Sequence, residues 1–146
     1  MRLDAKASPE LLAAIYAIRS LDKTIAKMIR QQTKRVAAPE TTKAMAERAD
    51  TRLEHRVMVN TAVVSVSNQN VRIQSARKGR PLKGGLDPKT DWYAVEFGGK
   101  AHQLKPRNKR GYVFYPAARE MIPRLARLWI ETTVRTIATA FEGKQE

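Results

Sequence analysis

Cysteine is absent from this chain of 146 residues, and histidine and long apolar runs are scarce. Without cysteine there is no disulfide framework and no thiolate metal site. The apolar runs fall far short of the roughly 20 residues that span a bilayer. The first residues also lack the apolar segment of a signal peptide. We therefore expect a protein that is soluble or part of a soluble assembly, with no membrane partner.

Recognisable catalytic motifs are also missing. The acidic residues are scattered, without an Asp-x-Asp pair or a His-Glu-x-x-His helix, and metal-dependent hydrolysis needs such clusters. The two histidines, His55 and His102, belong to no nucleophile motif. Gly79 and Gly84 have the spacing of a phosphate loop, but glycine and leucine follow where lysine and serine or threonine are required. We expect no enzymatic activity, no metal site and no cofactor.

Positive charge is what the chain has in excess, with 28 basic and 14 acidic residues. Residues 77–110 carry ten basic and three acidic side chains, which is half of the net charge of +14. Such a concentration attracts polyanions through counterion release, or acidic protein surfaces through charge complementarity. A solvated loop that keeps the protein soluble is the third interpretation. The residues predicted to contact DNA or an acidic partner are Arg77, Lys78, Arg80, Lys83, Lys105, Arg107, Lys109 and Arg110.

Hydrophobic periodicity predicts helices in the N-terminal part of the chain, residues 9–57. Ser8-Pro9-Glu10 has the residues of a helix start, and apolar residues then recur three or four apart to about residue 34. This long helix can lie across a small sheet or reach a neighbouring subunit. Pro39 is expected to break the pattern and to start a second helix that runs to about Val57. One longer element bent at Pro39 is the alternative.

A second amphipathic stripe predicts a C-terminal helix over residues 116–142. Pro116 suits its first turn. Pro123 lies inside the pattern and is expected to kink the helix or to force a new start. Gly143 is expected to end it.

The middle of the chain contains alternating, β-branched segments. Residues 58–67 and 70–77 are predicted to pair as an antiparallel hairpin. Residues 78–90 and 99–111 are predicted basic loops, and residues 112–115 have the composition of a short strand. The run from Asp91 to Phe97 is too short to distinguish a strand from a helical turn. The whole, residues 1–146, is predicted to be one α+β domain, a small antiparallel sheet with long N-terminal and C-terminal amphipathic helices packed on it.

The stretch from Asp91 to Ala118 alternates large apolar residues with dense charge, and six of the chain's nine aromatic residues lie in it. Glu96 stands directly before Phe97 and Gly98. A carboxylate at this place can accept backbone amides or pair with an arginine across an interface, and an exposed strand residue is the alternative. Gly98 is expected to supply a backbone angle that other residues disfavour.

This stretch also carries a family resemblance. Tyr93-Ala94-Val95-Glu96-Phe97-Gly98, a segment with His102 and Pro106, and then Phe114-Tyr115-Pro116-Ala117 resemble the neck or tail-completion proteins of long-tailed bacteriophages. The resemblance covers roughly residues 90–141. It implies a small α+β protein without catalysis that assembles as a ring at the head–tail junction, where double-stranded DNA passes. Tyr93, Glu96, Gly98 and Pro116 carry over as structural or interface positions, with Phe97 between them.

Two functions are therefore expected as alternatives. The resemblance implies a structural virion protein whose partners are further copies in a ring, neighbouring neck, connector and tail proteins, and DNA in the channel. Its places would be the virion and, during assembly, the host cytoplasm. The charge alone predicts a sequence-nonspecific nucleic-acid-binding protein, with Trp92 or Tyr112 stacking on unpaired bases.

Overall fold

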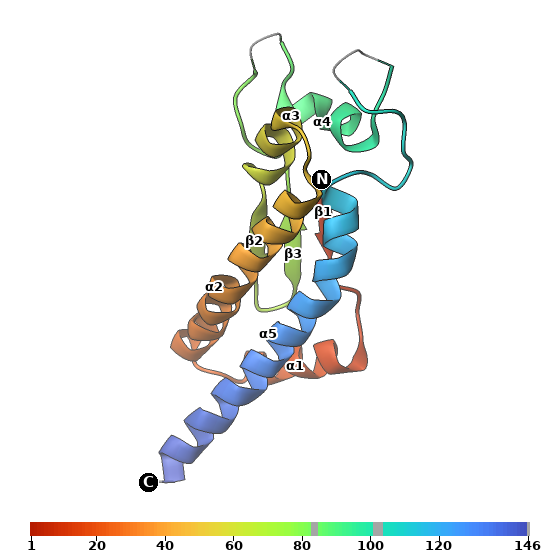
Figure 1. The fold of residues 1–146 in the computed structure, drawn as a ribbon. Helices are drawn as coiled ribbons and strands as arrows, with labels where there is room; N and C mark the ends of the chain where they lie inside the picture. The colour runs from red at the N-terminus through yellow and green to blue at the C-terminus, as the bar shows by residue number, and fades with distance from the viewer. Residues whose placement is uncertain (83–84, 101–103, 146) are drawn as a thin grey trace.

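The computed structural model describes residues 1–82, 85–100 and 104–145, with side chains to residue 139. It confirms the predicted α+β class, a small antiparallel sheet and long helices (Figure 1). The elements in chain order are β1 (Arg2–Asp4), α1 (Pro9–Arg19), α2 (Lys23–Arg48), α3 (Arg52–Glu54), the π-helical turn η1 (His55–Val59), β2 (Val63–Val66), β3 (Val71–Gln74), α4 (Pro88–Phe97) and α5 (Phe114–Gln145).

The sheet has the strand order β1-β3-β2, and both pairs are antiparallel. The predicted hairpin is confirmed, although its strands are shorter than residues 58–67 and 70–77. Met58 and Val59 belong instead to η1, and both are buried. The hydroxyl of Ser67 closes the hairpin by accepting the backbone N–H groups of Gln69 and Asn70 at 3.1 and 3.0 Å.

The N-terminal strand β1 was not predicted. It pairs with β3 so that Leu3 stands opposite Ile73. The N-terminal ammonium donates to the Ser75 carbonyl at 3.2 Å. Three residues are too few for an alternating pattern, so this strand is determined by its partner and not by its own sequence.

The predicted single helix over residues 9–34 is wrong, because the chain breaks between α1 and α2. Ser20 closes α1 and Asp22 caps α2, where the Asp22 carboxylate accepts the Thr24 N–H at 2.8 Å. The predicted break at Pro39 is also wrong, since α2 continues through it. Pro39 is exposed, so water can solvate the carbonyl that loses its amide partner. The alternative, one longer element bent at Pro39, is confirmed only in its continuity through the proline, and the predicted run to about Val57 is wrong because α2 ends at Arg48.

Helix α5 is 32 residues long and begins at Phe114. The strand predicted at 112–115 is wrong, because Phe114 and Tyr115 form the first turn of this helix. Pro116 follows within that turn, where a backbone N–H has no intrahelical partner to lose. Pro123 is exposed and forces no new start, and Gly143 does not end the helix, which runs on to Gln145.

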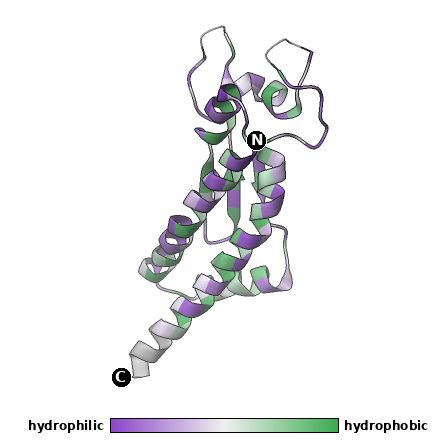
Figure 2. Cartoon of the chain, in the orientation of Figure 1, coloured by the Kyte–Doolittle hydropathy of each residue, from purple (hydrophilic) through white to green (hydrophobic). Residues whose placement is uncertain are grey.

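The core lies between the sheet and the helices α2 and α5, which pack against one another (Figure 1). Its largest fully buried side chains include Trp129, Phe114, Ile29, Met45 and Ile73. Hydrophobic and hydrophilic residues alternate along both helices, as an amphipathic helix on a core requires (Figure 2). The C-terminal part of α5 projects beyond the body, at the end opposite the loops that flank α4 (Figure 1).

Candidate functional site

The stretch that the sequence left undecided, Asp91–Phe97, is helical and belongs to α4. Asp87 caps this helix by accepting the Lys89 N–H at 3.0 Å, and Pro88 occupies its first position. Asp followed by Pro is a helix-start signal, so the predicted loop over residues 78–90 is wrong from Pro88 onward. The helix ends at Gly98, whose φ of 78° confirms the expected unusual backbone angle.

Glu96 is the central residue of this region, and it is fully buried. Its Oε1 accepts the backbone N–H groups of Val113 and Phe114 at 3.1 and 2.7 Å, and its Oε2 accepts that of Tyr115 at 3.0 Å. These are amides at the start of α5, which have no partners within the helix. Glu96 thus caps α5 from a different helix. The expectation that it accepts backbone amides is confirmed, and the alternative of an exposed strand residue is wrong.

The contacts of the Glu96 carboxylate indicate a structural role. Burial raises the pKa of Glu96 above its ordinary value, although the three backbone N–H donors oppose that shift and the charge of Glu54 adds to it. Burial and the Glu96 charge also raise the pKa of the neighbouring Tyr115. A buried carboxylate with a raised pKa is common in active sites. Here, however, both oxygen atoms are occupied by backbone amides, so the arrangement supports a cap.

The segment after α4 folds back on the end of this helix. Three backbone hydrogen bonds hold it there, from Gly99 N–H to the Lys105 carbonyl (2.9 Å), from Asn108 N–H to the Phe97 carbonyl (2.7 Å) and from Tyr112 N–H to the Glu96 carbonyl (2.9 Å). Gly111 lies so close to Glu96 that a Cβ atom there would overlap the carboxylate. A Cβ atom at Gly98 would overlap the backbone carbonyls of Lys105 and Pro106.

Gly98→Ala is therefore expected to lower the free energy of unfolding by roughly 2–4 kcal/mol, from backbone strain and steric overlap together. The φ of 78° with ψ of 177° is a conformation that only glycine adopts readily. Gly85→Ala is the matched control, because Gly85 has a φ of 92° but an added Cβ would meet nothing within 4 Å. Urea denaturation of both variants measures the difference. Equal losses would show that the contact with residues 105 and 106 has no effect.

Lys105, one of the predicted external contacts, is engaged inside the chain. Its Nζ lies 3.0 Å from Asp50 and 2.9 Å from Glu54, and 4.8 Å from the centre of the Tyr112 ring. Burial lowers the pKa of Lys105, but the hydrogen bonds and charges of Glu54 and Asp50 outweigh it, so the pKa lies above its ordinary value. Lys105 joins the loop to α3 and is not available to an external partner.

The other predicted contacts remain at the surface. Lys83 lies outside the described residues, and the remaining six, Arg77, Lys78, Arg80, Arg107, Lys109 and Arg110, are exposed. The structure brings their two loops, far apart in the sequence, to the same end of the molecule on either side of α4 (Figure 1). Arg56 of η1 joins Lys78 and Arg80 around one hollow. Arg56 was not predicted as a contact, because nothing in the sequence of its helical segment indicates that it lies beside Lys78 and Arg80.

An apolar cleft of about 970 Å³ lies between the end of α4 and the second loop. Tyr93, Phe97 and Gly98 from the motif line it, and its lining also includes Lys100, Pro106, Arg107 and Lys109. The Tyr93 side chain is 58% exposed. Glu96 is absent from this lining and turns toward α5, and Pro116 belongs to α5 itself. Of the five motif residues, three therefore line an open cleft, Glu96 forms a cap, and Pro116 lies in the helix that is capped.

A second apolar groove, of about 390 Å³, lies between α1 and α5. Its lining includes Ala13 and Ala17 of α1 and Ile130, Val134 and Ile137 of α5. Val134 is 62% exposed. We call this the α1–α5 groove. It was not predicted, because the stripe on the C-terminal helix gave no indication of which apolar residues the core would leave uncovered.

Comparisons with models of protein families, with curated proteins and with solved structures found no match. In the described part of the chain, no helix is both long enough and apolar enough to cross a bilayer. Within the same residues, no three His, Asp or Glu side chains are grouped so that they could hold a metal ion.

Proposed function

We propose that this protein is a structural subunit of the bacteriophage head–tail junction, a neck or tail-completion protein that assembles with further copies of itself into a ring. Two observations support the proposal. The motif around Tyr93, Glu96, Gly98 and Pro116 carries the resemblance, and the fold has the helices on a small antiparallel sheet that the resemblance implies. Its partners would be the adjoining neck, connector and tail proteins of the virion, which it would reach from the host cytoplasm during assembly.

A third observation, the projecting end of α5, carries the ring assembly. This part of the helix extends beyond the body (Figure 1), and the α1–α5 groove leaves Val134 62% exposed beside it. Helical segments without a packing surface are marginal in water, and uncovered apolar residues favour association. A neighbouring copy that packs against this groove would cover the exposed Val134 and would give the projecting end of α5 a packing surface. A contact in which the C-terminal end of α5 from one copy enters the α1–α5 groove of the next is heterologous and can close into a ring.

Val134→Glu tests this contact directly. A charge placed in the contact is expected to weaken self-association by about tenfold or more, which corresponds to about 1.4 kcal/mol. Val36→Glu is the matched control, because Val36 is similarly exposed, at 50%, but lies on α2 outside the groove. Both variants should fold like the wild type by circular dichroism, since neither residue is in the core. Sedimentation velocity and negative-stain electron microscopy measure the assembly.

Two results are expected, one for the assembly of the variants and one for the presence of the protein in virions. Wild type and Val36→Glu should form the same ring, alone or with the neighbouring virion proteins, and Val134→Glu should not. Unchanged assembly of Val134→Glu would reject the groove as the contact. Immunogold labelling that fails to find the protein in purified virions would reject the head–tail junction itself.

A further inference from the structure

We propose that the basic end of the molecule is a binding surface for the phosphate backbone of double-stranded DNA. We define this basic end by six exposed side chains on the two loops that flank α4, namely Arg77, Lys78, Arg80, Arg107, Lys109 and Arg110. The inference deepens the proposed function and rests on it for its setting, a ring through which DNA passes. The surface itself belongs to the single chain and can be tested there.

The acidic residues at this end are used within the protein. Lys105 holds both Asp50 and Glu54, and Glu96 is enclosed by backbone amides. Asp87 caps α4, and the Asp91 carboxylate accepts the Asp87 N–H at 2.9 Å. Glu96, Asp87 and Asp91 thus accept backbone amides, Asp50 is paired with Lys105, and Glu54 does both, since it also accepts the N–H groups of Asp50 and Thr51 at 3.1 Å each.

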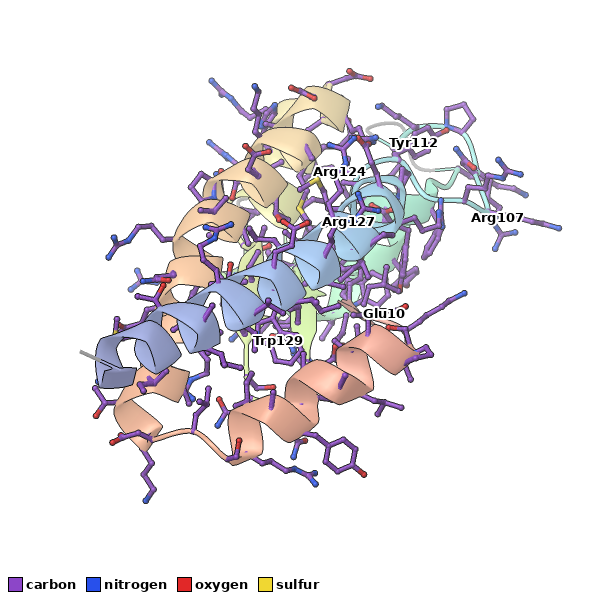
Figure 3. The ribbon with its side chains drawn as sticks, turned by 90° about the horizontal axis from the view of Figure 1, so that it is seen from below. Glu10, Arg107, Tyr112, Arg124, Arg127 and Trp129 are labelled. Carbon is purple, nitrogen blue, oxygen red and sulfur yellow. The ribbon has the colours of Figure 1, made fainter. Side chains whose placement is uncertain are left out.

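The basic residues have the opposite arrangement. Within residues 1–82, 85–100 and 104–139, none of the six side chains of the basic end has an ion-pair partner, whereas Arg48 and Arg72 elsewhere pair with Glu120 and Asp4. Figure 3 places Arg107 at the outer margin of its loop, away from the helical body. Unpaired cations on loops can meet phosphates without first breaking an internal contact. Their counterions, and those of the DNA, are then released on binding.

At the first loop, the chemistry of this surface favours phosphate over an acidic protein. Protein interfaces are depleted in lysine at their centre and depend on buried aromatic or aliphatic anchors. The hollow beside Lys78 and Arg80 has no aromatic residue in its described lining, which includes Arg56, Asn60 and Thr61. The cleft beside Arg107 and Lys109 does contain Tyr93 and Phe97, so the missing anchors distinguish the first loop only. Arginine and lysine on exposed loops are instead typical of contacts that hold a nucleic-acid backbone without reading its sequence.

Both side chains predicted to stack on bases, Trp92 and Tyr112, are occupied, and this favours a duplex over a single strand at those two positions; Tyr93, which is exposed, was not among them. The Tyr112 hydroxyl donates to the Pro106 carbonyl at 2.5 Å, and the Tyr112 ring lies beneath Lys105. Trp92 is partly buried and packs against Tyr93 and Phe97, with ring centres 6.4 Å apart in each pair. Binding of unpaired bases needs free aromatic faces, whereas a duplex backbone needs only the charges.

A matched pair of quadruple variants tests the surface. The loop variant replaces Arg77, Lys78, Arg107 and Lys109 with Gln, and the control replaces the exposed Lys23, Lys27, Lys34 and Arg35 on the first half of α2. Both lose four charges, but only the first set lies at the basic end. Fluorescence anisotropy with a short random-sequence DNA duplex, across a salt series, measures the binding constant. Each lost phosphate contact lowers the salt slope by about 0.9, so the loop variant should lose about 3–4 units.

The outcomes separate this proposal from the proposed function. An unchanged control slope with the expected loss in the loop variant supports the duplex surface. Equal changes in both variants, or no duplex binding by the wild type near physiological salt, would overturn it. Tighter binding of poly-glutamate than of duplex would also overturn it in favour of an acidic protein partner. The loop variant should still assemble like the wild type. Monomeric Val134→Glu should retain the salt slope of duplex binding. The duplex surface and the ring assembly can therefore be rejected independently.

Discussion

Replacing Glu96 with alanine is expected to lower the free energy of unfolding by roughly 3–5 kcal/mol, because buried N–H groups at the start of α5 lose their acceptor. Each unsatisfied buried donor costs about 1–3 kcal/mol, and the partly buried Tyr115 N–H can regain water. The loss is large against the roughly 5–15 kcal/mol of an ordinary domain. The substitution should also loosen the attachment of the segment that ends at Gly111, since the Glu96 carboxylate binds the Val113 N–H directly after this segment.

A graded series distinguishes the cap from simple burial. Glu96→Gln retains an oxygen for the N–H groups of Val113 and Phe114 but turns an amide donor toward the Tyr115 N–H, so its loss should be smaller than that of alanine. Glu40→Ala, on an exposed part of α2, is the control and should change stability by no more than about 0.5 kcal/mol. Urea denaturation gives the three values. A Gln variant as unstable as the alanine variant would contradict the hydrogen-bonded cap.

The pKa of Glu96 adds a dependence on pH. Burial raises the pKa of Glu96 in the folded state, so the folded protein takes up a proton more readily than the unfolded chain. This group therefore stabilises the fold most below its unfolded pKa, and that contribution is lost as the pH rises through the folded pKa. Glu96→Gln lacks the titrating group. From mildly acidic to neutral pH, the wild type should therefore lose stability relative to Glu96→Gln. A difference in unfolding free energy that stays constant over this pH range would contradict the raised pKa of Glu96.

The sequence predicted the chemistry of Glu96 but not its partners. A carboxylate between apolar residues and before a glycine indicates an acceptor for backbone amides. The amides themselves lie 17–19 residues further on, and no periodicity connects positions so far apart. The same limit explains β1, whose three residues form a strand only because β3 is already beside them.

The prolines show a different limit. Pro39 and Pro123 were expected to break helices, yet both lie on exposed faces of α2 and α5. A proline costs most where the lost hydrogen bond is buried and least where water can solvate the freed carbonyl. Which face of a helix meets the core depends on the packing partner, so the consequence of a proline cannot be settled from the local pattern alone.

The basic residues were predicted as a group, and tertiary contacts divide that group. Lys105 and Lys109 are four residues apart and chemically equivalent in the sequence. Only Lys105 meets the buried Glu54 and the neighbouring Asp50, because the loop returns past α3 at that point. Composition therefore located the charge correctly, whereas the separation of structural cations from available ones needed the fold.

Trp129→Ala is expected to cost roughly 3–5 kcal/mol, as truncation of a large buried aromatic residue commonly does. Trp129 is fully buried and is the largest such side chain in the described core. Its side chain lies on the side of α5 that faces the strands (Figure 3). A cavity at this position removes the packing that holds the middle of α5 to the body, just before the projecting end.

Trp129→Phe separates packing from hydrogen bonding at the same position. Among the described residues nothing accepts the Trp129 indole N–H, so phenylalanine removes some volume but no hydrogen bond and should cost no more than about 1.5 kcal/mol. Urea denaturation measures both variants, and equal losses would show that the indole N–H has an essential partner. The pair also connects stability to assembly. If α5 presents the α1–α5 groove to a neighbouring copy, Trp129→Phe should assemble like the wild type. Trp129→Ala should associate more weakly even where it remains folded, because the helix that carries Val134 is no longer held in position.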